Sequence, residues 1–256
     1  MMVIGFRQIG GLAMGLFGKM FEKKTCAFCG EDIGLFGNRK LEDGNMCKEC
    51  ASLLSPWFSD RKNSTVAEIQ EQLLYREENK AKLEAFHTTR SLGRNVKVLV
   101  DEEQNLFMVS RTRNIKEENP DILAFSQVTG CDLDIDEERH EITYEDKDGN
   151  EVSYNPKRYE YEYNFYMIIR VNHAYFDEIK FLLNQSSVIG KGTEYNQYKE
   201  MGTEICNLLS DARQNVRDQI AEAKAPKTAM VCPFCGATTI PDTNGCCEYC
   251  GGAMNI

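Results

Sequence analysis

The chain has 256 residues, of which 42% are hydrophobic and 27% charged, an ordinary composition for a soluble globular protein of one large domain or two to three small ones. Its formal net charge is -10, and residues 95–184 hold 10 basic groups against 20 acidic groups. Such an acidic centre disfavours a general affinity for nucleic acids or anionic membranes, because both kinds of binding require a basic surface.

The first 24 residues form an N-terminal extension whose apolar patches are interrupted by Arg7, Gln8 and Lys19. Several glycines weaken any helix there and no small-residue cleavage site follows, so we expect neither a transmembrane segment nor a secretory signal. Two interpretations of residues 1–13 stay open. They precede a natural start at Met14, or they form a weakly amphipathic segment that binds a surface or a partner.

Eight of the eleven cysteines form four C-x-x-C pairs, two near each end of the chain. Secreted disulfide frameworks are typical of small domains with an even number of cysteines, so these clustered pairs indicate metal binding in a reducing compartment, and we expect a cytoplasmic protein. Zinc binds four thiolates in a tetrahedron, so each site needs two pairs, and we expect two zinc ions per chain. The predicted ligands are Cys26, Cys29, Cys47, Cys50, Cys232, Cys235, Cys247 and Cys250.

Three of the four pairs share a finer pattern, seen in the segments CAFCG, CPFCG and CEYCG. An aromatic residue before the second cysteine and a glycine after it are typical of a zinc knuckle, whose glycine permits a turn that directs backbone N–H groups toward the sulfur atoms. This register selects Cys247 rather than Cys246 as a ligand. Cys131 and Cys206 belong to no pair.

The fourth pair, in CKECASLLS, precedes an apolar helical turn, and a position at a helix start is expected to lower the pKa of the Cys47 and Cys50 thiols. A knuckle, a hairpin and ligands at a helix start indicate a treble-clef-like module over residues 25–60. Two knuckles without a following helix indicate a zinc ribbon over residues 230–256. Because four cysteines leave no open position for water, both zinc ions are expected to be structural.

Residues 64–87 are expected to form a connecting amphipathic helix that begins with a capping box of Thr65 and Glu68. Its apolar residues recur at helical spacing but lapse between Leu74 and Leu83. We therefore expect this helix to pack against a neighbouring domain. A coiled coil that forms a homodimer is the less favoured alternative.

From Asn95 the apolar period changes to two, and the pattern predicts seven or eight short antiparallel strands, including a hairpin turned by KDGN. Asp132, Asp134 and Asp136 alternate with apolar residues in this region. That alternation indicates an exposed strand face rather than a calcium-binding loop.

The last predicted strands lead to a long helix. The strand over residues 158–171 carries aromatic and aliphatic side chains at alternate positions from Tyr159 to Val171, and this face is expected to pack in the core. Apolar residues at steps of three or four then predict a helix over residues 198–220. The predicted fold class is α+β, with an antiparallel barrel or sandwich over residues 94–225, closed by its C-terminal helix and flanked by the two zinc modules. This order of elements looks like that of pleckstrin-homology domains.

The segments TCAFCGEDIGLFGNRKLEDGNMCKEC, SYNPKRYEYEYNFYMIIRVNH and YFDEIKFLLN, together with their surroundings in residues 14–184, resemble an uncharacterised family of bacterial proteins. Its members share an N-terminal four-cysteine domain of unknown function. This resemblance implies zinc binding by the first four cysteines and implies no known activity. The first module is also similar to the zinc-binding domain of a bacterial protease-associated unfoldase, a domain that dimerises and recruits proteins.

No residue pattern marks out a nucleophile, a general base or an open metal site, so we expect a protein that is not an enzyme. The favoured function is that of a zinc-binding interaction or adaptor protein with a protein partner. The alternative is a regulatory zinc-ribbon protein that binds nucleic acid through a local basic patch. That patch would consist of Arg39, Lys40, Arg61 and Lys62.

Overall fold

The computed structural model describes residues 24–224, 229–242 and 245–254, so nearly all of the predicted N-terminal extension lies outside the described residues. The chain divides into two compact units, Met1–Ser210 and Asp211–Ile256. Within the described ranges, no helix is both long enough and apolar enough to cross a membrane.

The first unit begins with a small cysteine-containing module made of two hairpins and a single helical turn. Its core contains two cysteines together with Leu41, Met46 and Leu54, all of them buried. A 3-10 turn, η2, precedes the next helix. The elements are β1 (Lys24–Thr25), β2 (Asp32–Ile33), β3 (Arg39–Lys40), β4 (Asn45–Met46), α1 (Lys48–Ala51) and η2 (Arg61–Asn63).

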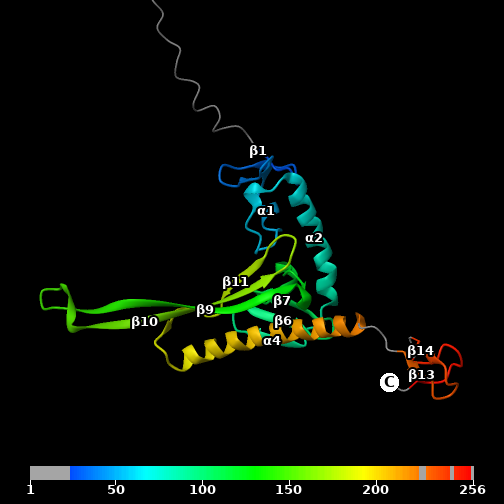
Figure 1. The fold of residues 1–256 in the computed structure, drawn as a ribbon. Coiled ribbons are helices and arrows are strands. Elements are labelled where there is room, and N and C mark those ends of the chain that lie inside the picture. Colours follow the sequence, from blue (N-terminus) through cyan, green and yellow to red (C-terminus); the bar gives the residue numbers. More distant parts are fainter. Residues whose placement is uncertain (1–23, 225–228, 243–244, 255–256) are drawn as a thin grey trace, which may run out of the picture. The chain divides into compact units, whose positions relative to one another are not determined.

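Helix α2 (Val66–Ala85) joins this module to the strands that follow (Figure 1). It begins at the predicted capping box, in which the Glu68 N–H donates to the Thr65 side chain and the Thr65 N–H donates to Glu68. Its first turns belong to the core of the module, where Ile69 is buried. Its last turn, with Leu83, packs against the first large sheet. The helix thus packs against both the module and the sheet, which belong to the same compact unit.

The first large sheet has four antiparallel strands in the order β5-β6-β7-β8. Four buried side chains share one face of this sheet, because residues two apart on a strand point the same way and the register pairs Val100 with Phe107. They are Val98, Val100, Phe107 and Val109. The elements are β5 (Arg90–Gly93), β6 (Lys97–Asp101), β7 (Leu106–Ser110), α3 (Ile115–Glu118), β8 (Leu123–Ala124) and the 3-10 turn η3 (Phe125–Gln127).

The second large sheet is built around two long strands where the sequence predicted several short ones. β10 (Glu151–Val171) pairs with β9 (Val128–Glu145) along its length and turns at the predicted KDGN, where Gly149 has a positive φ of 80°. β11 (Glu178–Leu182) and β12 (Val188–Ile189) pair only with the later half of β10. The outer part of the β9–β10 hairpin therefore extends beyond the other strands as a two-stranded arm (Figure 1).

Two predictions are wrong because β9 and β10 form this arm. The described strands form no closed barrel, because β9 and β10 continue outward together instead of curving round to meet the first sheet. The apolar face of β10 is buried from Tyr163 to Val171, as predicted, but Tyr159 and Tyr161 are exposed because they lie at the base of the arm. The coarser prediction of a mixed fold with antiparallel sheets is confirmed.

Helix α4 (Thr193–Lys224) follows the second sheet, and its first half covers one face of that sheet (Figure 1). The rings of Tyr195 and Tyr198 lie 5.2 and 5.6 Å from the ring of Phe165 on β10. Gly202 allows a close approach, because a Cβ atom there would lie 2.6 Å from a methyl carbon of Leu133 on β9.

The second unit contains a cysteine-containing module with one short hairpin. Strand β13 (Met230–Val231) pairs with β14 (Thr238–Thr239). The buried core of this module consists of Cys232, Cys247 and Met254, and Met230 packs against them. So small an apolar core contributes little stability by itself.

Candidate metal centres

The structure brings all eight predicted cysteines together in two groups of four. Within each group the four sulfur atoms lie within 4.8 Å of one another, so each group could hold one metal ion. The first group lies in the hairpin module of the first unit and the second group in the C-terminal module. The members are Cys26, Cys29, Cys47 and Cys50 in the first group and Cys232, Cys235, Cys247 and Cys250 in the second.

The three predicted knuckles share one backbone geometry. Gly30, Gly236 and Gly251 have φ angles of 76°, 74° and 70°, a left-handed conformation that glycine adopts without strain. Each glycine N–H donates to the carbonyl of the first cysteine of its knuckle, at 2.8 to 3.0 Å. The repeated C-x-aromatic-C-G pattern therefore corresponds to a repeated turn, which places the two sulfur atoms of each pair on the same side.

The fourth pair starts a helix instead. Cys47 caps the N-terminus of α1, and its sulfur accepts a hydrogen bond from the Cys50 N–H at 3.3 Å. The Cys47 N–H in turn donates to the sulfur of Cys26, also at 3.3 Å. Backbone N–H groups that point at sulfur stabilise thiolates, so the module is shaped to hold negative charge at this point.

The thiols of the first group differ in acidity. Burial opposes ionisation of Cys26, but the N–H groups of Cys29, Cys47 and Phe28 outweigh burial and lower the pKa of Cys26 to about 6. Burial and the neighbouring thiols raise the pKa of Cys50. The pKa of Cys47 is also raised. The Cys50 N–H lowers it, but burial and hydrogen bonds with the thiols of Cys26 and Cys29 outweigh that donor.

These directions contradict the expected lowering at Cys47 and Cys50. α1 is only four residues long, so its dipole is weak, whereas three other sulfur atoms lie within 4.8 Å. Once one thiolate forms, a second negative charge at this distance is disfavoured unless a cation is present.

The second group shows the same inequality. The Cys235 N–H outweighs burial and lowers the pKa of Cys232 to about 6. The Gly252 N–H favours the thiolate of Cys250, but the thiol of Cys235 and burial outweigh it and raise the pKa of Cys250 to about 12. Cys246 lies outside the group, as predicted. Its N–H donates to the side chain of Asp242, and its backbone forms an isolated β-bridge with Ala253.

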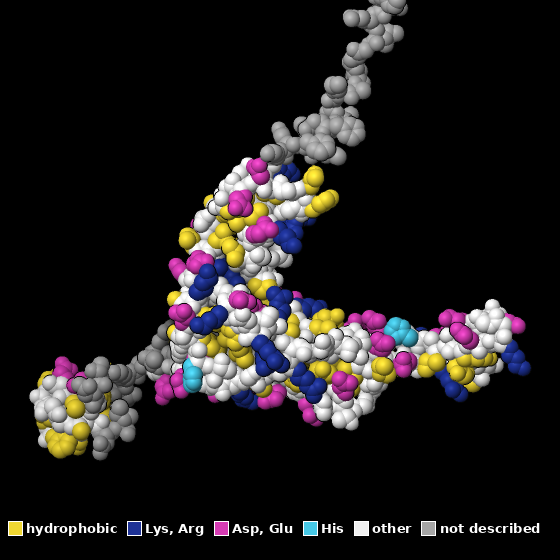
Figure 2. Space-filling view, turned by 180° about the vertical axis from the view of Figure 1, so that it is seen from behind, with side chains coloured by type: hydrophobic (Ala, Val, Ile, Leu, Met, Phe, Trp, Pro, Cys, Tyr) yellow, Lys and Arg dark blue, Asp and Glu magenta, His cyan; other side chains and the backbone are white. Residues whose placement is uncertain are grey.

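Large apolar side chains are exposed beside both groups. Leu35 and Phe36, in the turn between β2 and β3, are 79% and 94% exposed. In the second module the knuckle aromatics Phe234 and Tyr249 are 71% and 69% exposed, whereas Phe28 of the first knuckle packs against its module core. Figure 2 shows hydrophobic side chains at the surface of both modules.

The predicted basic patch is partly assembled. Arg61 donates to the carbonyl of Lys40 at 2.5 Å. Burial, followed by the charge of Arg39, lowers the pKa of Arg61. The side chains of Arg39 and Arg61 are therefore close enough to interact, whereas Lys40 contributes only its backbone carbonyl to this contact.

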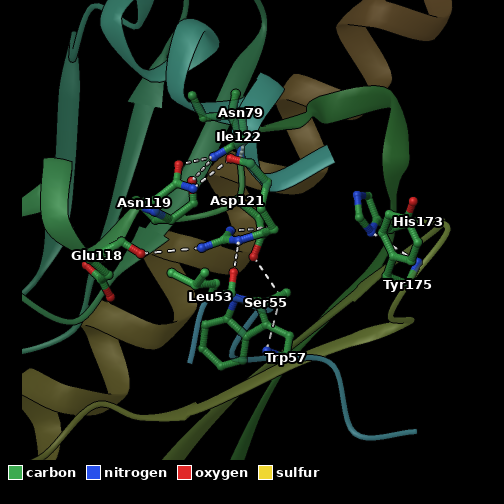
Figure 3. Close-up of polar contacts among 12 residues, drawn as sticks. Leu53, Ser55, Trp57, Asn79, Glu118, Asn119, Asp121, Ile122, His173 and Tyr175 are labelled. Carbon is green, nitrogen blue, oxygen red and sulfur yellow. Dashed lines mark hydrogen bonds and ion pairs between the residues drawn. The ribbon is translucent and has the colours of Figure 1, made fainter. Parts of the chain in front are cut away.

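Sequence reasoning missed the polar contacts that hold the first module against the strands (Figure 3). Arg76 of α2 is buried and forms an ion pair with buried Asp121 at 2.8 Å. The other carboxylate oxygen of Asp121 accepts a hydrogen bond from Ser55 of the module at 2.7 Å. Buried Asn79, one turn further along α2, donates to the side chain of Asn119 at 2.9 Å and accepts from the Ile122 N–H at 3.1 Å.

A signal for this network was present in the sequence. The apolar stripe of α2 lapses between Leu74 and Leu83, and the buried positions there carry Arg76 and Asn79. In the sequence alone this lapse argues against a coiled coil. It marks instead a stretch where the buried face of the helix is polar.

A second missed feature is a pair of cysteines. The sulfur atoms of Cys131 on β9 and Cys206 on α4 lie 3.0 Å apart. The hydrogen bond between the two sulfur atoms raises the pKa of Cys131 and lowers the pKa of Cys206. A separation of 75 residues along the chain carries no spacing pattern, so only the fold reveals this pair.

Residues 25–72 match the profile of a protein family described as "Domain of unknown function (DUF4428)". The match covers the first cysteine group and extends into α2 as far as Gln72. This extent agrees with the packing, because Ile69 belongs to the core of the module. No curated protein matches the chain. No solved structure matches it either.

Proposed function

We propose that this chain is a non-enzymatic interaction protein of the cytoplasm, built around two structural zinc ions. The observation that carries the zinc assignment is the spacing of the sulfur atoms. Four sulfur atoms at about 2.3 Å from a central zinc ion in a tetrahedron lie about 3.8 Å apart. The separations are 3.8 Å for Cys29–Cys47, 3.6 Å for Cys232–Cys250 and 3.7 Å for Cys235–Cys247.

Four thiolates fill the coordination sphere of zinc, so neither site offers a position for water or substrate. The ions would serve to fold the two modules, the first in a treble-clef-like arrangement and the second as a zinc ribbon. Two antiparallel sheets followed by a long helix, in the order of a pleckstrin-homology-like domain, would act as the scaffold that carries the first module.

The exposed apolar side chains of the two modules support a protein partner. Leu35 and Phe36 extend from one module, and Phe234 and Tyr249 lie on the surface of the other. Exposed aromatic residues beside a rigid, metal-bound turn favour contact with an apolar protein surface. A four-thiolate zinc site also carries a net charge of about -2, which disfavours a nucleic-acid backbone.

Metal analysis of the purified full-length protein tests the zinc assignment. We expect about two zinc ions per chain, falling to about one in Cys247→Ser. Cys246→Ser is the matched control, since the two cysteines are adjacent, and it should keep two. A metal content of one or none in the unaltered chain, or equal loss in both variants, would contradict the assignment.

Crosslinking capture from the native host tests the partner. The unaltered chain should retain a protein that is lost from a Leu35→Ser, Phe36→Ser variant or from a Phe234→Ser, Tyr249→Ser variant, while the zinc content of each variant stays at two. Recovery of nucleic acid alone would reject a protein partner and support the zinc-ribbon alternative.

A further inference from the structure

A cavity of about 610 Å³ in the first unit gathers basic side chains in an otherwise acidic region of the chain. It opens at one end of the first large sheet, beside the segment that follows β11. Its basic lining residues are Arg94, Lys97, Arg111 and Arg113, and none of the described residues that line it is acidic. Leu99 and Leu182 give the cavity an apolar part.

The strand register explains why these four cations meet. Lys97 opens β6 and pairs with Ser110, the last residue of β7. The β5–β6 turn and the segment leaving β7 therefore lie at the same end of the sheet, and each carries two cations. Gly93 makes the tight turn before Arg94, with a φ of 100° and no room for a Cβ atom, which would lie 2.2 Å from the Val96 carbonyl oxygen.

Two of the cations are held in place by aromatic rings. The guanidinium of Arg94 lies 5.0 Å from the ring centre of Tyr198 and donates to Gln197 at 2.8 Å. The guanidinium of Arg111 lies 5.1 Å from the ring centre of Trp57, with Glu118 at 3.8 Å. Stacking of this kind fixes an arginine while leaving its other N–H groups available to a ligand.

The other two cations are free to contact a ligand. Lys97 and Arg113 are exposed, and within the described residues neither has an ion-pair partner. Four positive charges around one hollow repel one another unless an anion is present. Among the described residues, Glu118 is the only carboxylate that forms an ion pair with any of the four, and it pairs with Arg111 alone.

We propose that this cavity binds the phosphate groups of a small phosphorylated molecule. Guanidinium groups bind phosphate oxygens through paired hydrogen bonds, and the cavity volume lies within the range of small-molecule sites. An extended nucleic acid fits less well. Its backbone needs a continuous basic surface, whereas the central region that contains the cavity holds 10 basic groups against 20 acidic groups over residues 95–184.

This inference goes beyond the proposed function and does not depend on either zinc site. The phosphate could belong to a soluble compound or to a lipid headgroup, since the cations recognise the same group in both. The cavity would then sense a metabolite or a membrane surface, respectively, and the experiment separates the two.

Binding is measured on the full-length, zinc-loaded protein by calorimetry with inorganic triphosphate and with ATP. Sedimentation with vesicles made of equal parts phosphatidylcholine and phosphatidic acid provides the lipid arm. We expect saturable binding of at least one probe. In the double variant Lys97→Gln, Arg113→Gln the Kd should rise by about tenfold to a hundredfold, because two charge-assisted contacts are removed.

The matched control is the double variant Lys147→Gln, Arg217→Gln. It likewise removes one lysine and one arginine charge, both from exposed side chains that do not line the cavity, and its Kd should stay within about twofold of the unaltered protein. Triphosphate also chelates metal, so the zinc content is measured after each titration. Chelation would affect both variants alike.

Binding of triphosphate or ATP that weakens only in the cavity variant supports a soluble ligand. Binding of vesicles alone, with the same dependence, supports a lipid headgroup. No saturable binding of any probe, or equal weakening in both variants, would overturn the proposal. If the double variant loses its thermal unfolding transition, it is replaced by the single variants Lys97→Gln and Arg113→Gln, each of which should raise the Kd by about threefold to tenfold.

Discussion

The thiols of each cysteine group ionise unequally, and this inequality determines how metal binding responds to pH. Cys26 and Cys232 have pKa values lowered to about 6, whereas the pKa of Cys50 and that of Cys250 are raised. Near neutral pH the metal-free groups therefore already hold some negative charge, and the remaining thiols must lose protons to bind a cation.

We expect zinc binding at pH 7 to release fewer than four protons from each group. The thiolates of Cys26 and Cys232 are already formed at that pH, because it lies above their pKa. For each of these two cysteines the folded-state pKa lies below the ordinary value of 9, so the stabilisation is complete above pH 9 and is lost as the pH falls through about 6. Zinc affinity should accordingly fall more steeply below pH 6 than above it.

Calorimetry of zinc binding in buffers with different ionisation enthalpies counts the released protons. The Cys232→Ser variant isolates the first group, and the Cys26→Ser variant isolates the second. Release of four protons from either group at pH 7, or a zinc affinity that falls equally steeply above and below pH 6, would contradict the inequality.

The pair Cys131 and Cys206 makes a separate residue-level prediction. Their sulfur atoms are 3.0 Å apart. One equivalent of hydrogen peroxide should therefore oxidise the two thiols to a disulfide with release of two water molecules. The disulfide would tie α4 to β9 across a long loop and raise the free energy of unfolding by about 2–4 kcal/mol.

Peptide mass analysis under non-reducing conditions identifies this crosslink, and thermal unfolding measures its effect. Cys131→Ser should abolish both. Cys246→Ser is the control and should change neither. A crosslink between other cysteines, with Cys131 still reduced, would show that the metal-binding thiols react first.

At the scale of elements, α2 is the part that connects the first module to the sheets, and its middle is held by charge rather than by apolar packing. Arg76 and Asp121 are both buried. Asp121→Asn keeps the shape of the side chain but leaves the guanidinium of Arg76 without its counter-charge. We expect this variant to lose about 3–5 kcal/mol of unfolding free energy, measured by urea denaturation.

Glu77→Gln provides the matched control, because Glu77 pairs with Lys80 on the exposed side of the same helix. An exposed pair contributes little, so this variant should lose less than about 0.5 kcal/mol. If the two variants lost similar amounts, the buried pair would not be what holds the module in place.

Local patterns predicted much of the fold and of the metal centres. The knuckle glycines, the choice of Cys247, the capping box of α2 and the KDGN turn each depend on a few neighbouring residues, so their sequence signals are direct. Partners such as Asp121 for Arg76 lie far apart in the chain and carry no spacing. The length of β9 and β10 was also missed, since the polar residues of the arm resemble turn residues.

For the molecule as a whole, the metal centres and the sheets depend on different cores. Cysteines are themselves core residues in both modules, whereas the sheets bury Phe107, Phe165 and other large side chains away from any cysteine group. A strong zinc chelator should therefore unfold residues 24–58 and 229–254 locally while residues 97–110 stay folded.

Hydrogen exchange followed by mass spectrometry measures this difference along the chain. Exchange in the two modules should rise by orders of magnitude after chelation, and readdition of zinc should reverse the change. A parallel loss of protection in residues 97–110 would show that the sheets, too, depend on the metal.

Strand β9 provides a physical reason for the acidity of the central region. Within the described residues it pairs only with β10, so no strand covers its other edge. A long free edge invites another chain to add a strand, which is the first step of aggregation. The carboxylates along β9, including Asp132, Asp134 and Asp136, would make two such edges repel each other. Much of the net charge of -10 can thus be read as protection of one strand against self-association, whatever partner the protein binds elsewhere.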